Sequence, residues 1–138
     1  MDKNTLFYTE DHEWVQVLDD NTVRIGITDY AVEQLGDIVY VEVPEMDEEY
    51  DLEEAFANIE SVKSTSEIYA PIAGKVTAVN ETLEDEPENV NEDPYELGWI
   101  CELTSESAID TSHLISLEQY TEFVEAYVYS LSSNGNER

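Results

Sequence analysis

Short stretches of alternating apolar and polar residues, each ended by a turn, most limit the folds open to this chain. The extended stretches are residues 14–18, 22–27, 37–43, 55–62, 67–70, 75–79 and 99–103. A side-chain period of two is typical of strands that place one face on a core. The pattern therefore predicts a mainly β protein built from many short strands.

The last part of the chain changes its period. Apolar side chains recur every three to four residues over residues 116–131, and Ser116 with Gln119 resembles a capping box. We expect an amphipathic C-terminal helix that packs on the sheet, followed by a frayed tail at residues 132–138.

The segments between the strands also carry local signals. Thr28 or Asp29 can cap a short helix over residues 30–35. Residues 19–21 predict a hairpin turn, and residues 45–54 predict an acidic loop. Residues 80–98 contain two prolines and predict a long ordered loop or a set of turns.

At 138 residues, the chain is most simply one domain over residues 1–138, with its core strands in residues 14–103. The segment GDIVYVE at residues 36–42 resembles GKVTAVN at residues 74–80. Two similar halves suggest a sandwich with approximate two-fold symmetry. The alternative is that any strand led by a glycine looks like this.

Acidic residues are spread along the whole chain: 34 Asp and Glu stand against five Lys and Arg, for a net charge of -29. Nucleic acid and anionic membranes are therefore poor partners, because both attract a basic face. Salt would screen the self-repulsion, since the Debye length falls to about 3 Å at 1 M. We hypothesise a salt-rich cytoplasm; the alternative is an ordinary acidic protein with a positively charged partner.

The sequence also argues against several classes of protein. The N-terminus is acidic without an apolar core, and no stretch is long and apolar enough to span a membrane, so we expect a soluble cytoplasmic protein. Cys101 is the only cysteine, which excludes an intramolecular disulfide and predicts a buried, inert thiol. Neither His12 nor His113 has a partner at metal-ligand spacing, so no metal site is expected.

Lys63 falls at the connection between two extended stretches, residues 55–62 and 67–70. That position predicts the tip of a hairpin, with the amine in water. A solubilising surface charge is the simplest reading, but this chain avoids lysine almost everywhere else, and Lys3 is expected to lie in a frayed end of the chain. An amine on a rigid tip is what the covalent attachment of a carrier group requires.

The chain resembles the H protein of the glycine cleavage system over nearly its whole length. The matching segments are YT (8–9), HEWV (12–15), IGITDYA (25–31), LGDIVYV (35–41), PE (44–45), ESVK (60–63), APIAG (70–74), VN (79–80), VNEDPY (90–95) and GW (98–99). ESVK alone would be a weak match. The same blocks in the same order across one small domain are specific. Residues 45–53 depart from the family pattern, with acidic residues where the family usually has glycines, so we expect Asp47 to take a left-handed conformation there.

This resemblance implies a barrel-sandwich hybrid of β-strands with a lysine at a hairpin tip and a C-terminal helix. It also implies lipoate in amide linkage on Lys63, within a lipoylation segment that includes Glu60, Ser61, Val62 and Ser64. An enzyme that attaches lipoate is then a required partner.

The resemblance further implies a cycle in which the protein catalyses no step. A pyridoxal-phosphate glycine decarboxylase loads the aminomethyl group of glycine onto the lipoyl arm. An aminomethyltransferase releases ammonia and passes the one-carbon unit to tetrahydrofolate, and a dihydrolipoyl dehydrogenase reoxidises the arm with NAD. A monomer that binds these partners transiently is expected.

In the family, the loaded arm folds into a cleft, and its amine should be cationic. Glu13 and Glu67 lie in segments that the family places near this cleft, so either could hold the amine by a charge-assisted hydrogen bond. The alternative is that both are surface carboxylates, as most are in so acidic a chain.

Other functions stay open beside this one. A lipoyl domain of a 2-oxo acid dehydrogenase is also a carrier, but it would not explain residues 12–15 or the C-terminal helix. An H-like protein that relays lipoyl groups to other enzymes would share the whole pattern. An enzyme is disfavoured, because the sequence marks no catalytic pair of carboxylates, phosphate loop or nucleophile motif.

Overall fold

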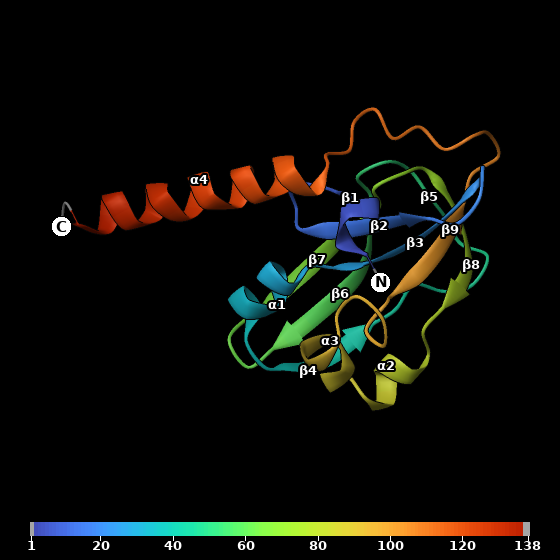
Figure 1. The fold of residues 1–138 in the computed structure, drawn as a ribbon. Helices are drawn as coiled ribbons and strands as arrows, with labels where there is room; N and C mark the ends of the chain where they lie inside the picture. Colours follow the sequence, from blue (N-terminus) through green and yellow to red (C-terminus); the bar gives the residue numbers. More distant parts are fainter. Residues whose placement is uncertain (1, 137–138) are drawn as a thin grey trace.

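Two antiparallel sheets form the body of the protein in the computed structural model, which describes residues 2–136 and their side chains through residue 126 (Figure 1). The strands are β1 (Phe7–Tyr8), β2 (Glu13–Val17), β3 (Thr22–Ile27), β4 (Ile38–Glu42), β5 (Glu49–Tyr50), β6 (Ala55–Ser61), β7 (Thr65–Tyr69), β8 (Gly74–Val79) and β9 (Cys101–Thr104). The helices are the 3-10 helix η1 (Lys3–Thr5), α1 (Asp29–Leu35), α2 (Thr82–Asp85), α3 (Glu88–Glu92) and α4 (Leu117–Asn136).

The larger sheet has the order β1-β2-β3-β9-β8-β5, and the smaller sheet has the order β4-β6-β7. The strand pairings described are all antiparallel. The predicted mainly β fold with a C-terminal helix is confirmed. The two glycine-led segments lie in different sheets, with β4 in the smaller and β8 in the larger, and the two-fold symmetry stays a prediction.

Local sequence signals account for the best-predicted elements. The turn between β2 and β3 is closed by Asp19, whose carboxylate accepts hydrogen bonds from the backbone N–H groups of Asn21 and Thr22, both at 2.9 Å. Thr28 caps α1 by accepting a hydrogen bond from the N–H of Ala31 at 3.2 Å. These side chains satisfy backbone donors that the turn and the helix leave unpaired.

The segment at residues 80–98 is more regular than expected, because it forms the short helices α2 and α3. Leu83 on α2 and Val90 on α3 are both fully buried in the main core. Asn80 fastens the segment, since its side-chain amide donates to the carbonyls of Leu97 and Trp99 at 2.8 Å each. The helices exist because each buries one apolar side chain, which the polar composition of the segment conceals.

Two further segments contain strands that the sequence pattern did not predict. The acidic loop at residues 45–54 includes β5, in which Glu49 pairs with Lys75 and Tyr50 with Gly74. The N-terminal β1 pairs with β2. The expected left-handed conformation of Asp47 is confirmed, with φ at 70°.

The N-terminal region is better fixed than expected. Lys3 lies in η1, donates to Asp29 at 3.1 Å and sits over the ring of Tyr95 at 4.5 Å. The expectation that Lys3 belongs to a frayed end is therefore wrong, because it has both a carboxylate and an aromatic partner.

The predicted capping box of α4 is confirmed in both directions. The N–H of Ser116 donates to the side chain of Gln119 at 3.0 Å, and the N–H of Gln119 donates to the hydroxyl of Ser116 at 3.2 Å. The helix continues to Asn136, beyond the expected end near residue 131, so the expected tail is helical over residues 132–136. Residues 137–138 lie outside the described residues.

Only the first turns of α4 are seen to meet the body of the protein, and Figure 1 shows the helix leading away from the sheets. Tyr120 is buried and stacks on Tyr8 of β1 at 4.9 Å between ring centroids. Leu117 and Val124 pack against the same small cluster. The expected packing on the sheet therefore holds for this part, whereas the side chains of residues 127–138 lie outside the described ones.

The main core lies between the two sheets and includes Cys101, whose thiol is fully buried with a pKa raised by burial. The expected inert thiol is confirmed. Trp14 is fully buried in a smaller cluster with Tyr8 and Tyr120. Trp99 is only half-buried, and the guanidinium of Arg24 lies over its ring at 4.5 Å while it pairs with Glu102 at 2.7 Å.

Candidate functional site

Lys63 lies in the loop at residues 62–64 that joins β6 to β7, so the expected hairpin tip is confirmed. Ser61 closes this turn with its side chain. Its hydroxyl accepts the backbone N–H groups of Lys63 at 3.2 Å and Ser64 at 3.1 Å, and its own N–H donates to the Ser64 carbonyl at 2.8 Å. The serine thus supplies the turn chemistry for which Asn-Gly would otherwise be expected.

The loop is fastened to the neighbouring strand as well as to itself. The N–H of Val62 donates to the carbonyl of Asp37 at 2.9 Å, just before β4 begins. Lys63 is exposed, and its ammonium makes no ion pair with any carboxylate in the described part of the chain. The amine is therefore presented to solvent from a fixed backbone.

The side chain of Lys63 runs across Gly36, the residue that ends α1. Its Cε lies 3.3 Å from where a Cβ of residue 36 would stand. Gly36 has φ at 81° and ψ at -149°, a conformation that is essentially reserved for glycine. The end of α1 is thus bare at the place where the lysine passes.

Glu13 is buried, with 2% of its surface exposed. Its carboxylate accepts the hydroxyl of Thr9 at 2.7 Å and the N–H of Tyr69 at 3.3 Å. Burial raises the pKa of Glu13 to about 7, with a smaller rise from the charge of Asp11, while the two hydrogen bonds act in the opposite direction. The alternative reading of Glu13 as a surface carboxylate is therefore wrong.

Glu13 and Glu67 line the same pocket of about 140 Å³, although they come from different sheets. The apolar residues that line it are Ile27, Ala31, Leu35, Ile59 and Ile68. Glu67 is exposed, so it lies at the open side, whereas Glu13 lies at the buried side. The β6–β7 hairpin supplies both Lys63 and part of the pocket wall, which brings the three predicted charged residues into one region.

His12 joins this pocket to the C-terminal helix, a role that sequence reasoning missed. Its Nδ1 lies 2.8 Å from the hydroxyl of Tyr120, and that hydroxyl is 2.7 Å from the hydroxyl of Thr28. His12 has φ at 71°, and its partial burial lowers its pKa. The partner of His12 lies far along the chain, so no local pattern indicates it.

These features fit an amide-linked lipoyl group. The amine of Lys63 is accessible for attachment, and the adjacent pocket has apolar walls. Glu13 and Glu67 line the same pocket and are the groups that could bind the cationic amine of a loaded arm. Ligand pockets for whole small molecules usually measure about 300–1,000 Å³. A pocket of about 140 Å³ suits the end of a tethered arm rather than a free cofactor.

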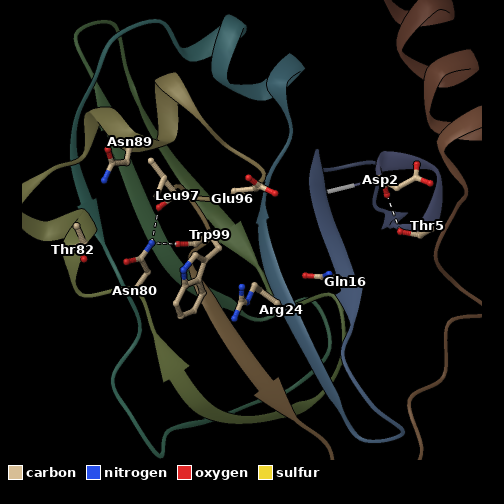
Figure 2. A pocket seen from close by; sticks show the side chains of 10 residues that line it. All are labelled: Asp2, Thr5, Gln16, Arg24, Asn80, Thr82, Asn89, Glu96, Leu97 and Trp99. Atoms are coloured by element: carbon tan, nitrogen blue, oxygen red, sulfur yellow. Dashed lines mark hydrogen bonds between the residues drawn. The ribbon is translucent and has the colours of Figure 1, made fainter.

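A larger and more open hollow of about 660 Å³ lies elsewhere and includes none of the residues of the Lys63 hairpin (Figure 2). Figure 2 shows Arg24 beside Trp99, and Asn80 bonded to the backbone at Leu97 and Trp99. Arg24 is already paired with Glu102, and both side-chain N–H bonds of Asn80 go to backbone carbonyls.

No group of three or more His, Cys, Asp and Glu side chains that could hold a metal ion occurs among the described residues. In the same part of the chain, no helix is long and apolar enough to cross a membrane.

Comparison with known proteins decides the family. The family model described as glycine cleavage H-protein matches residues 6–127. The chain belongs to this family. As an H protein it is a lipoyl-bearing aminomethyl carrier of the glycine cleavage system, without catalytic activity of its own.

Similar proteins cover most of the chain. A probable glycine cleavage system H protein of Thermococcus gammatolerans is 50% identical over 125 residues, which cover 90% of this chain and 92% of the relative. A glycine cleavage system H protein of Halalkalibacterium halodurans is 50% identical over 121 residues, covering 88% and 94%. This H protein is therefore close in length to its relatives.

The fold is also that of a solved H protein. The crystal structure of a glycine cleavage system H protein from Mycobacterium marinum matches with a TM-score of 0.79 and 34% identity. The match covers 86% of this chain and 95% of that one. The barrel-sandwich hybrid expected from the sequence is confirmed.

Proposed function

We propose that this H protein carries lipoate on Lys63 and uses the pocket beside α1 to shelter the loaded arm. The observation that supports it most is the presentation of Lys63 on a hairpin held by Ser61 and Asp37, with an amine that forms no ion pair among the described residues. A rigid attachment point and a free amine are the two requirements for a swinging carrier group.

Lipoate, once attached, supplies a dithiolane that can be reduced, can carry an aminomethyl group on one sulfur and can be reoxidised. The residues of this chain hold the lipoyl arm and shield its loaded end from water. Lys63 fixes the tether, and Gly36 leaves the end of α1 open to it. The apolar walls of the pocket keep water from the sheltered end, which slows the breakdown of a labile aminomethyl group.

Glu13 and Glu67 would hold the cationic amine from two sides of the pocket. Because Glu13 has a pKa near 7, its carboxyl is part protonated at neutral pH, and a nearby ammonium favours the ionised form. A buried carboxylate paired with an ammonium binds more strongly than an exposed one, since water screens it less. We therefore assign the larger share of the binding to Glu13.

The partners follow from the cycle of the glycine cleavage system. They are a glycine decarboxylase, an aminomethyltransferase, a dihydrolipoyl dehydrogenase and an enzyme that attaches lipoate. The net charge of -29 favours docking faces that are basic. We expect a monomer that meets each partner transiently.

The test is intact-mass spectrometry of the protein from its native host, followed by mapping of the peptide that contains Lys63. We expect one lipoyl group on Lys63, its loss in Lys63→Arg, and its retention in Lys75→Arg, a control that removes another half-exposed lysine. An unmodified Lys63 in cells that lipoylate other proteins would refute the assignment.

A further inference from the structure

Exposed apolar side chains gather beside Lys63 on an otherwise acidic protein. The exposed fractions are 54% for Val39, 43% for Tyr40 and 68% for Val62. Val39 and Tyr40 are neighbours in β4, where strict alternation would bury one of them. Both side chains are nevertheless exposed, which the alternation of the strand does not explain.

A β-bulge turns both side chains outward. Ile38 pairs with Ser61 and Tyr40 pairs with Glu60, so Val39 is an extra residue in the ladder. Bulges commonly re-aim side chains next to functional sites. The core does not need this arrangement, because Ile38 and Val41 already fill the inner face of the strand.

The bulge and the lysine loop form one rigid surface. The N–H of Val62 donates to the carbonyl of Asp37 at 2.9 Å, and the next residue, Ile38, pairs with Ser61. An enzyme that binds Val39, Tyr40 and Val62 would therefore find Lys63 at a fixed position. We call these three side chains the β4 patch.

We propose that the β4 patch is the docking surface for the enzyme that attaches lipoate to Lys63, an inference that rests on the proposed function. The length of the lysine side chain limits which surface this enzyme can use. An unmodified lysine extends its amine only about 6 Å from Cα, by the sum of its bond lengths. The attaching enzyme must therefore contact the surface next to Lys63, whereas enzymes that use the finished, longer arm can dock further away.

The reaction at this surface needs an activated lipoyl donor such as an acyl-adenylate. The ammonium of Lys63 gives up one proton, and the free amine attacks the carbonyl carbon of the donor. The amide C–N bond forms as the donor's C–O bond breaks, AMP leaves with the electron pair, and the nitrogen loses a second proton. The docked enzyme supplies the donor, and this chain supplies the nucleophile.

The charges around the β4 patch indicate which surface the enzyme must present. The exposed carboxylates of Asp37, Glu42 and Glu60 lie next to the β4 patch in sequence or in the ladder. A matching enzyme presents an apolar seat with Lys or Arg around it, beside the opening to its donor site. Added salt would then slow association, since it screens the charges around the β4 patch. The apolar contact itself would be little affected.

The experiment measures lipoylation of the unmodified protein by the lipoate-attaching enzyme of the native host, supplied with lipoate and ATP. The variant is Val39→Ser with Tyr40→Ser. Its control is Val17→Ser with Leu18→Ser, which are 40% and 42% exposed at the opposite end of β2 from Glu13. We expect kcat/KM to fall about tenfold in the β4 variant, mainly through KM, and to stay within about twofold in the control.

Two measurements test whether kcat/KM falls only because the variant is unfolded or its lysine is less accessible. Thermal unfolding checks that both variants fold, and acetylation of Lys63 by a small activated ester checks that the amine is equally accessible. Equal kcat/KM values for the β4 variant and wild type would overturn the docking proposal alone, whereas a wild-type protein that is never lipoylated would remove the proposed function as well. A rise in the KM of the glycine decarboxylase without any change in lipoylation would assign the β4 patch to that enzyme and also overturn the proposal.

Discussion

The hydroxyl of Tyr120 lies 2.8 Å from Nδ1 of His12, which ties the C-terminal helix to the residue before the buried Glu13. The same hydroxyl reaches the hydroxyl of Thr28, the cap of α1. The Tyr120 hydroxyl therefore connects α4 with two segments that contribute to the pocket, the one that contains His12 and Glu13 and the helix α1. The first turns of α4 serve the carrier site as well as the stability of the fold.

Tyr120→Phe tests this connection. Removing the hydroxyl deprives the buried Thr28 and the partly buried His12 of a hydrogen bond, and we expect a loss of about 1–3 kcal/mol in the free energy of unfolding. Urea denaturation measures it, with Tyr40→Phe on the exposed face of β4 as the matched control, expected within about 0.5 kcal/mol of wild type. An unchanged stability for Tyr120→Phe would show that the contact contributes nothing.

Glu13 gives the protein a specific pH dependence. Burial raises its pKa from 4.5 to about 7 in the folded state, so between these pH values the folded protein keeps a proton that the unfolded chain has lost. The contribution of Glu13 to the free energy of unfolding therefore falls as pH rises through this window, by about 3 kcal/mol in total for a shift of this size. Above the window this contribution stays constant.

Glu13→Gln removes the titration, so its stability relative to wild type should increase from pH 4.5 to pH 7. Urea denaturation of both proteins across this range measures the difference, which cancels the other carboxylates. Glu67→Gln is the matched control, because it makes the same change at an exposed carboxylate that lines the same pocket. A constant difference for Glu13→Gln would contradict a raised pKa.

The loaded protein offers a functional counterpart. If Glu13 holds the ammonium of the sheltered arm, Glu13→Gln should shorten the lifetime of the aminomethyl-loaded form by about tenfold, the worth of one charge-assisted hydrogen bond. Glu67→Gln should shorten it less. The lifetime is followed by mass spectrometry of the loaded form after the decarboxylase is removed, and no change in Glu13→Gln would remove Glu13 from this role.

Gly36→Ala should destabilise the protein without touching the core. A side chain in the conformation of Gly36 is strained by about 1–3 kcal/mol, and its Cβ would stand 3.3 Å from Cε of Lys63. Denaturation of Gly36→Ala, alone and combined with Lys63→Ala, separates the two causes. We expect most of the loss to persist in the double variant, and full recovery there would mean that the lysine contact, not backbone strain, is responsible.

Salt should stabilise this protein. With a net charge of -29 the folded chain repels itself, and screening that repulsion favours the compact state. Thermal melts should shift upward between about 0.1 M and 2 M KCl, over which the Debye length falls from about 10 Å to below about 3 Å. Melts in sucrose control for general solute effects. A melting temperature that does not change with KCl concentration would contradict the hypothesis of a salt-rich host.

Interactions between residues close in the sequence could be predicted before the structure was known. Asp19 closes its turn, Thr28 caps α1, and Ser116 caps α4, because each bonds to backbone groups two or three residues away. The hairpin position of Lys63 follows from the two strands that flank it. Recognition of the family then supplied the expected chemistry.

The tertiary structure alone decided the rest. Glu13 looks like one carboxylate among 34 acidic residues, and only the approach of Tyr69 from another strand, with Thr9 from a neighbouring turn, buries it and moves its pKa. The outward turn of Val39 depends on the register between β4 and β6. The turns and caps could be predicted from the sequence because their hydrogen-bond partners lie within a few residues, and the longer strands because their side chains alternate, whereas β1, β5, α2 and α3 could not. Burial, electrostatic environment and register depend on segments brought together from far along the chain, so only the folded structure could decide them.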